Sequence, residues 1–296
     1  MLTSQAIRAV LDLALAEDAP WGDVTSELLI PADASAVATL TAREPGVFSG
    51  AEVFVAAMTA VDPATSVDLR VADGDSFEEG AVLAAVAGNA RAILRAERVA
   101  LNLVQRMSGI ATLTARYVAE VRGTAARVVD TRKTTPGLRA LERHAVCCGG
   151  GHNHRFSLSD AVLVKDNHLA VLAQGGHRGL TEALRDARSR LSHTTHFEVE
   201  VDRIGQIEAV VAAGVDTIML DNFSIAELRE GVALVGGRVL IEASGNVNLD
   251  TVGMIAGTGV DIISVGALTH SVRALDLGLD ISLRDAAPPG RGQTAP

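Results

Sequence analysis

The chain has 296 residues, of which 48% are hydrophobic and 3% aromatic, so it can bury a large aliphatic core in one large domain or two ordinary ones. The net charge of -10 disfavours nucleic acid and anionic membranes as partners, and an anionic ligand would need a local basic cluster. Because the chain has no membrane-length apolar run, no signal-peptide pattern and only two adjacent cysteines, we expect a cytoplasmic protein without structural disulfides.

The first 107 residues predict a mixed α/β unit. Apolar residues recur at helical spacing over 4–16, and two strands, 37–43 and 67–71, lie on either side of a helix at 52–61. A longer helix is expected over 90–107. Four polar residues lie along one of its faces: Arg91, Arg95, Arg98 and Asn102. Because this row has no obvious partner in its own unit, it is either a solvated face or part of a binding surface.

Beyond Gly109, short β-rich runs alternate with helical stretches, which predicts parallel strands joined by right-handed crossovers. Almost every run ends in a polar or charged residue. The six runs are 127–130, 161–165, 197–201, 217–221, 239–242 and 261–265. A capping box at 224–227 opens a helix that is expected over 227–234.

Polar groups at the carboxyl ends of parallel strands are typical of an α/β barrel, in which the loops after the strands build the site. About 165 residues are too few for eight full units, which need roughly 250, so we expect an incomplete barrel. A doubly wound open sheet is the alternative, since its ligands also lie at strand carboxyl ends. Polar groups at the end of each predicted run, or one position before it, favour the barrel.

The run at 197–202 alternates between apolar and acidic residues. We expect Phe197, Val199 and Val201 to pack under outer helices, which directs Glu198 and Glu200 into the barrel. Inward carboxylates are costly unless cations or a metal pair with them.

Cations are available for this pairing. They come from the first two strand ends and the segment between them: Arg132, Lys133, Arg139, His154, Arg155 and Lys165. Three carboxylates come from later strands: Glu200, Asp221 and Glu242. Arg and Lys bind carboxylates and phosphates, whereas carboxylates bind divalent ions and sugar hydroxyls. The arrangement therefore suits a ligand with several negative charges together with hydroxyls or Mg2+.

Both lysines of the chain, Lys133 and Lys165, belong to this set, against twenty-four arginines. Such a composition indicates positions that need a compact ammonium rather than a planar guanidinium. The alternative is that two lysines remain by chance on solvated loops.

Glycine-bearing turns at 242–246 and 264–268 follow the last two strands and precede helices. Their free N–H groups can face a phosphate at the rim of the barrel. Each turn alone is equally explained by ordinary turn chemistry, but the pair favours a phosphate site.

Three other features have plainer interpretations. A zinc site is disfavoured by the spacing of the candidate ligands, which are His144, Cys147, Cys148, His152 and His154. Asp130 could act as a base, but an ion pair with Lys165 or Arg155 explains it better. The triple glycine at 149–151 predicts a chain reversal rather than a phosphate cradle, because no helix signal directly follows it.

Nine segments in chain order carry a family resemblance: 22–25 (GDVT), 97–102 (ERVALN), 130–139 (DTRKTTPGLR), 149–155 (GGGHNHR), 165–168 (KDNH), 198–200 (EVE), 220–222 (LDN), 242–245 (EASG) and 265–270 (VGALTH). Together they resemble the quinolinate phosphoribosyltransferase family, the carboxylating nicotinate-nucleotide pyrophosphorylases, over nearly the whole chain. The chain departs from that pattern at Arg143 and His144, where a basic-aromatic pair is expected, and at the adjacent Cys147 and Cys148.

The resemblance implies an α/β fold: an N-terminal α/β sandwich domain at 1–109, completed by the C-terminal segment 275–296, and an incomplete α/β barrel with parallel strands at 110–274. It implies transfer of phosphoribosyl from phosphoribosyl diphosphate to quinolinate with loss of CO2. The products would be nicotinate mononucleotide and pyrophosphate, in NAD biosynthesis, with Mg2+ or Mn2+ as cofactor. It also implies a homodimer, with higher oligomers left open.

Carried over by position, the resemblance implies two adjoining ligand sites. Quinolinate would contact Arg98 of the partner subunit, Arg132, Lys133, His154, Arg155 and Lys165. Phosphoribosyl diphosphate would contact Glu200 and Asp221 through its ribose and Mg2+, with the metal held mainly by pyrophosphate, and Ser244, Gly245 and Gly266 through its 5'-phosphate. Thr131, Arg139, Asn246, Val265 and Ala267 complete the candidate substrate-binding set. The candidate catalytic residues are Lys133, Lys165, Glu200 and Asp221.

Two alternative functions share many of these features. A related phosphoribosyltransferase for nicotinate or a molybdenum-associated substrate would use the same barrel, but it would not need cations for two carboxylates. A non-catalytic barrel that senses a phosphosugar would not need charged groups on both halves of its site.

Overall fold

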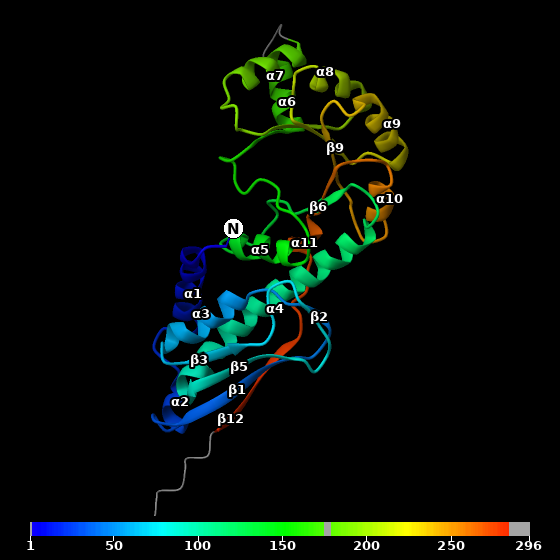
Figure 1. Ribbon diagram of the computed structural model, residues 1–296. Coiled ribbons are helices and arrows are strands. Elements are labelled where there is room, and N and C mark those ends of the chain that lie inside the picture. The colour runs from blue at the N-terminus through cyan, green and yellow to red at the C-terminus, as the bar shows by residue number, and fades with distance from the viewer. Residues whose placement is uncertain (1, 175–178, 284–296) are drawn as a thin grey trace, which may run out of the picture. The chain divides into compact units, whose positions relative to one another are not determined.

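The computed structural model describes residues 2–174 and 179–283. The chain forms two compact units, one from residues 2–106 with the described residues from Leu275 onward, the other from residues 107–274 (Figure 1). Of the predicted C-terminal segment 275–296, residues 284–296 lie outside the described residues. No helix in the described ranges is both long enough and apolar enough to span a membrane.

The division between the units falls within a single helix, α4 (Ala90–Glu120). The sequence pattern predicted that this helix ends at residue 107, and that prediction was wrong. Ser108, Ile110 and Ala111 are completely buried. Their tertiary packing outweighs the cost of about 1 kcal/mol for a glycine inside a helix, so Gly109 does not interrupt it.

The N-terminal unit is built on an antiparallel sheet of order β12 (Leu277–Leu283), β1 (Ser35–Ala42), β5 (Val82–Asn89) and β3 (Ser66–Leu69). Alternate residues of β1 are buried, as expected of a strand with one face on the core: Ala36, Ala38, Leu40 and Ala42. The remaining elements are α1 (Ser4–Asp18), α2 (Val24–Leu29), α3 (Ala51–Val61) and a short pairing of β2 (Gly46–Val47) with β4 (Ser76–Phe77). Helix α3 contacts α1 and β3 (Figure 1).

Strand β5 and helix α2 are among the elements of this unit that were not predicted from the sequence. Strand β5 is rich in alanine and glycine, which are poor strand formers, and its pairing with both β1 and β3 decides its structure. Helix α2 has six residues and exposes Val24, Leu28 and Leu29, so it shows no amphipathic pattern. Its start is fixed by Asp23, whose carboxylate accepts the backbone N–H of Ser26 at 3.1 Å.

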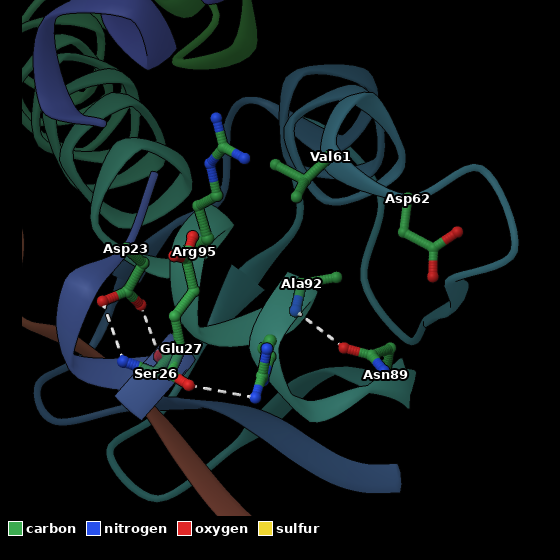
Figure 2. Close-up of a pocket in the computed structure, with 9 residues that line it drawn as sticks. Asp23, Ser26, Glu27, Val61, Asp62, Asn89, Ala92 and Arg95 are labelled. Atoms are coloured by element: carbon green, nitrogen blue, oxygen red, sulfur yellow. Dashed lines mark hydrogen bonds between the residues drawn. The ribbon is translucent and has the colours of Figure 1, made fainter. Parts of the chain in front are cut away.

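The polar row on α4 does have partners in its own unit, contrary to expectation. Arg91 donates from Nε to Ile30 O (2.7 Å) and from Nη2 to Glu27 O (3.1 Å). These carbonyls lie at the carboxyl end of α2, where a helix leaves acceptors unsatisfied. Arg91 and Arg95 both line a pocket that α2 also borders (Figure 2). Arg95 Nη2 donates to Ala19 O at 3.4 Å. Arg98, by contrast, is exposed and has no hydrogen bond or ion pair among the described residues.

The second unit contains a six-stranded sheet in which every neighbouring pair is parallel. Its order is β6 (Arg127–Val129), β11 (Ile262–Ser264), β10 (Leu240–Ser244), β9 (Thr217–Asp221), β8 (Phe197–Val201) and β7 (Val162–Val164). All six predicted runs are strands. Within the described ranges β6 and β7 do not pair with each other, so the barrel stays open. The predicted fold class, with an incomplete barrel of parallel strands, is confirmed.

Helices cover the outer side of this sheet. They are α6 (Asp166–Gln174), α7 (Leu180–Ser189), α8 (Ile207–Val211), preceded by a 3-10 turn at Ile204–Gln206, α9 (Ile225–Val235) and α10 (Val252–Ala256). Neighbours from α6 to α10 contact one another in succession (Figure 1). The predicted capping box is present, with Ser224 and Glu227 bonded reciprocally, although α9 already begins at Ile225. All five residues of β8 are buried, as in a sheet covered on both faces.

The triple glycine reverses the chain, as predicted. Helix α5 (Arg139–Cys148) ends there, and Gly150 adopts a φ of 82°. A Cβ on Gly149 would lie 2.6 Å from Thr114 Cβ on α4, so only glycine permits this close approach. The chain then returns at His152, which forms a bridge with Val129 at the end of β6. The segment after His152 is thereby placed beside the carboxyl ends of the strands.

Candidate active site

A pocket of about 430 Å3 lies at the carboxyl ends of the parallel strands. Thirteen residues line it: Thr131, Arg132, Lys133, His154, Arg155, Leu163, Lys165, Glu200, Met219, Asp221, Glu242, Ser244 and Ser264. We call Arg132, Lys133, Arg155 and Lys165 the cationic wall, and Glu200, Asp221 and Glu242 the acidic wall. The structure thus brings together nine of the substrate-binding residues predicted from the sequence.

The cationic wall begins directly after β6. The backbone of Lys133 is held from two sides, because its N–H donates to Thr131 Oγ1 (3.1 Å) and its carbonyl accepts from Thr269 Oγ1 (2.8 Å). Burial, together with the nearby charge of Arg132, lowers the pKa of Arg155. The lowered pKa reflects like charges crowded in a partly desolvated site, which an anionic ligand would relieve.

The acidic wall lies on consecutive strands. Glu200 on β8 forms an ion pair with Lys165, so the two walls meet at this point. Asp221 ends β9 and accepts a hydrogen bond from Asn222 Nδ2 at 2.6 Å. Ser244 on β10 stands in register with Asp221, which places a hydroxyl beside this carboxylate. The prediction that Glu200 points into the barrel is confirmed.

The barrel interior beside the pocket holds a buried cluster of His154, Glu198 and Glu242. His154 Nε2 lies 3.2 Å from Glu198 Oε2 and 3.5 Å from Glu242 Oε2. Burial alone would lower the pKa of His154, but the hydrogen bonds and charges of both glutamates outweigh it and raise the pKa to about 10. Burial raises the pKa of Glu198, against the hydrogen bond from His154. The inward direction predicted for Glu198 is confirmed, and its partner is a histidine.

One contact opposes a second proton on His154. The backbone N–H of Arg155 lies 2.7 Å from Nδ1, which fits a neutral ring with its proton on Nε2. Two buried carboxylates without a cation cost more than one neutral hydrogen bond, so we assign the imidazolium form.

Asp130 does not pair with Lys165 or Arg155, and that prediction was wrong. Its carboxylate is fully buried and forms an ion pair with Arg143, with Nη1 and Oδ1 3.2 Å apart. Burial raises the pKa of Asp130 to about 6, although the charge of Arg143 acts in the opposite direction. Arg155 instead donates from Nη1 to Ala161 O at 3.0 Å. The ion pair between Arg143 and Asp130 could not be predicted from the sequence, because the pairing depends on how α5 packs beside β6.

Seven predicted substrate-binding residues are not among those that line the pocket: Arg98, which belongs to the other unit, Arg139, Gly245, Asn246, Val265, Gly266 and Ala267. Arg139 donates to Thr134 Oγ1 (2.9 Å) and to Phe156 O (3.1 Å), so it engages the neighbouring loops.

The structure explains why glycine occupies the turns after β10 and β11. Gly245 has a φ of 92°, and a Cβ there would lie 2.9 Å from the backbone nitrogen of Asn222. Asn222 N–H donates to Ser244 O (2.8 Å), so the turns after β9 and β10 are bound to each other. A Cβ on Gly266 would lie 3.0 Å from Lys133 Cδ, so this glycine leaves room for the lysine side chain.

Four residues that line the pocket were absent from the predicted substrate-binding set: Leu163, Met219, Glu242 and Ser264. Each lies two positions before a predicted site residue, on the same face of its strand. The period of two could therefore have found them. Glu242 had been placed among the acidic groups, without a ligand.

The carboxylates of this pocket fit a divalent ion that is coordinated mainly by a bound substrate. In the described part of the chain, Glu200 and Asp221 have no third carboxylate, histidine or cysteine close enough to complete a protein-only site. Mg2+ usually takes one or two carboxylates, with substrate phosphates and water filling the other positions. His154, Glu198 and Glu242 do form a three-ligand group, but the geometry is equally that of an imidazolium between two carboxylates.

Known proteins are similar to this chain over nearly its whole length. The family description "Quinolinate phosphoribosyl transferase, C-terminal domain" matches residues 110–280, and the corresponding N-terminal domain matches residues 23–108. The chain is 43% identical to a carboxylating nicotinate-nucleotide pyrophosphorylase of Mycobacterium leprae, covering 93% of this chain and 97% of the relative. It is 39% identical to a probable enzyme of that name in Bacillus subtilis, covering 94% of both.

Solved structures show the same similarity. The NadC structure from Streptococcus pyogenes superposes with a TM-score of 0.91 at 38% identity, covering 96% of this chain and 99% of that one. The nicotinate-nucleotide pyrophosphorylase from Francisella tularensis gives a TM-score of 0.88 at 34% identity, covering 95% and 98%. Both domains, in order and over nearly their full length, place the chain in the quinolinate phosphoribosyl transferase family.

Proposed function

We propose that the pocket of the barrel transfers phosphoribosyl from phosphoribosyl diphosphate to quinolinate, with release of pyrophosphate and CO2 and formation of nicotinate mononucleotide. Family membership supports this reaction. The observation that carries the site assignment is the division of one pocket into a cationic and an acidic wall. Quinolinate brings two adjacent carboxylates, and phosphoribosyl diphosphate brings hydroxyls and phosphates with a divalent ion.

Quinolinate is assigned to the cationic wall and His154. Guanidinium groups hold carboxylates through paired hydrogen bonds, which orients the pyridine ring as well as binding it. Burial and the nearby charge of Arg132 lower the pKa of Arg155, and this crowding of two guanidinium groups supports a dianionic ligand at this place. A singly charged acid such as nicotinate would leave part of this charge unpaired, so the two-carboxylate acceptor is favoured.

Phosphoribosyl diphosphate is assigned to the acidic wall and the glycine turns. Glu200 and Asp221 would contact the ribose hydroxyls and share in holding Mg2+ or Mn2+, which when bound neutralises the charge of the leaving pyrophosphate. The N–H groups around Gly245 and Gly266 would face the 5'-phosphate, since both turns directly follow the carboxyl ends of barrel strands, β10 and β11. Here Ser244, which lines the pocket, supplies a hydroxyl.

The walls then divide the chemistry between them. As pyrophosphate leaves, positive charge develops on the ribose, and the carboxylates of Glu200 and Asp221 stabilise it. The cationic wall holds the pyridine nitrogen in line with the ribose carbon that it attacks. Once that nitrogen is alkylated, the ring becomes an electron sink and the 2-carboxylate departs as CO2. We assign Lys133 to hold charge near this carboxylate and to supply a proton to the ring carbon that loses it.

We also propose a homodimer in which Arg98 of the partner subunit completes the quinolinate site. Arg98 is exposed and has no hydrogen-bond partner within residues 2–174 and 179–283, which supports this role, because Arg91 and Arg95 on the same helix are occupied by backbone carbonyls. A cytoplasmic location is proposed on the composition alone.

One assay tests the proposed reaction. Purified protein with quinolinate, phosphoribosyl diphosphate and Mg2+ should release CO2 and pyrophosphate in equal amounts, with nicotinate as the control acceptor. Release of pyrophosphate with nicotinate but not with quinolinate would overturn the assignment of the acceptor.

A further inference from the structure

The segment that presents His154 and Arg155 to the pocket belongs to no helix or strand. It starts beyond the bridge between His152 and Val129 and continues to Phe156. Polar backbone groups in a partly buried segment need hydrogen-bond partners, and here no ladder or helix supplies them. The positions of the His154 and Arg155 side chains therefore depend on the side chains that form hydrogen bonds with this backbone.

Arg143 on α5 supplies the donors. Its side chain is 10% exposed. Nη2 donates to His154 O at 2.6 Å, and Nη1 donates to Arg155 O at 3.1 Å. One planar guanidinium thus satisfies two successive carbonyls of the irregular segment. The ring of Phe156 lies against the same guanidinium, with 5.3 Å between Cζ and the ring centroid.

Asp130 supplies the acceptor from the other side. Its Oδ1 accepts the backbone N–H of His154 at 2.8 Å and also pairs with Arg143 Nη1 at 3.2 Å. The side-chain amide of Asn153, oriented with its nitrogen inward, donates to Asp130 Oδ2 (2.5 Å) and to Arg143 O (3.0 Å). The N–H and the C=O of His154 are therefore held by the two members of one buried ion pair.

We propose that Arg143 and Asp130 are positioning residues for quinolinate, which clamp the backbone of His154 and Arg155 and so set the geometry of one side of the acceptor site. This inference rests on the proposed assignment of quinolinate to that side. The pair touches no ligand itself: neither residue lines the pocket. Its effect reaches the substrate only through the backbone that it holds.

The hydrogen-bond pattern separates positioning from simple charge neutralisation. To neutralise Asp130, one positive charge would be enough, and lysine could provide it. Arg143 instead directs its two terminal nitrogens to three acceptors at once, which requires the fixed fork of a guanidinium. A lysine at this position would keep the positive charge but lose at least one of the hydrogen bonds to the two carbonyls.

The first test compares Arg143→Lys and Arg143→Met by steady-state kinetics with each substrate varied. Misplacement of binding groups by about an ångström costs up to roughly a hundredfold. We expect the KM for quinolinate to rise about tenfold to a hundredfold in Arg143→Met and less in Arg143→Lys. The KM for phosphoribosyl diphosphate should stay within about twofold, because the acidic wall has its own supports.

Arg188→Met is the matched control. Arg188 also forms an ion pair with an aspartate, Asp216, and donates to a backbone carbonyl, that of Thr195, at 3.3 Å. Neither Arg188 nor Asp216 lines the pocket. This variant should lower the melting temperature without changing the ratio of the two KM values.

A second variant keeps the proposal testable if Arg143→Met does not fold. The double variant Asp130→Asn with Arg143→Met removes both buried charges, which relieves the cost of an unpaired carboxylate. The variant still lacks the donors for His154 O and Arg155 O. We expect it to fold, as judged by circular dichroism, and to keep the raised KM for quinolinate.

Three results would overturn the inference. These are a normal quinolinate KM in the double variant, equal losses for both substrates, and the same substrate-specific loss in Arg188→Met. Failure of the proposed function is distinguishable, because the wild-type protein would then release no CO2 from quinolinate under any of these conditions.

Discussion

The two walls of the pocket are built by different means. The acidic wall lies on strands β8, β9 and β10, so the inward direction of its carboxylates follows from the pleat of a paired sheet. Most of the cationic wall lies on irregular segments, whose backbone is held by side chains from elsewhere, such as Thr269 at Lys133 and Arg143 at Arg155. Mutations should therefore impair the two walls differently. The acidic wall should lose function when its own carboxylates are changed. The cationic wall should also lose function when residues that do not contact a substrate are changed.

The largest effect is expected from the proposed contribution of Arg98 of a second copy of the chain to the quinolinate site. Arg98→Ala and Lys133→Ala homodimers should each be nearly inactive, because one site residue is missing from every site. Mixing them should restore activity to about a quarter of the wild-type level, since half of the randomly exchanged dimers carry one intact site.

Subunit exchange must be shown independently in that experiment, for example by pull-down through a tag on one variant. If exchange occurs and activity stays at the level of the separate variants, Arg98 does not act in the partner's site. The exposed end of the row on α4 would then be a solvated face.

Removal of the divalent ion tests the acidic wall. Glu200 is paired with Lys165, and the described residues offer no third protein ligand near Glu200 and Asp221. The ion should therefore take most of its ligands from phosphoribosyl diphosphate. Metal-stripped protein in chelator should therefore lose nearly all activity, and Mg2+ or Mn2+ should restore it. Full activity in chelator would contradict this account.

A smaller effect is expected at the turn that supports the acidic wall. Gly245→Ala puts a side chain at a φ of 92° and against the backbone of Asn222, which should cost on the order of 1 to 3 kcal/mol of stability and weaken phosphoribosyl diphosphate binding. Gly214→Ala is the control, because Gly214 has a φ of 79° with open space around it. If both variants unfold at the same urea concentration, the close contact with Asn222 contributes nothing.

A pH dependence of stability is also expected from His154. Its pKa is raised to about 10 in the folded protein, above the ordinary 6.5, so its contribution to stability is fully present below pH 6.5 and is lost as the pH rises through 10. One proton limits the slope to about 1.4 kcal/mol per pH unit. Urea unfolding between pH 6.5 and 10 should show wild type losing stability relative to His154→Gln. A constant difference between them would mean that the ring is neutral throughout.

The sequence predicted the fold and the acidic wall better than the supports of the cationic wall, and the reason is physical. Glu200 and Asp221 could be placed because a strand alternates its side chains, and the same period would have found Leu163 and Met219. The partner of Asp130 could not be predicted from spacing, because it depends on the packing of α5.

Local signals also failed where packing outweighs them. Gly109 marked the end of a helix that in fact continues, because its neighbours are buried. The alanine-rich β5 carried no strand pattern and is fixed by pairing on both sides. Propensity and spacing describe what a segment prefers, whereas these elements are decided by distant partners.

Binding calorimetry on two single variants tests the division of the pocket most directly. Arg155→Ala should weaken quinolinate binding by about 1.5 to 3 kcal/mol, the value of a charge-assisted hydrogen bond, and leave phosphoribosyl diphosphate binding nearly unchanged. Asp221→Ala, measured with Mg2+ present, should show the reverse. Equal losses for both ligands in either variant would contradict a pocket with one cationic and one acidic wall.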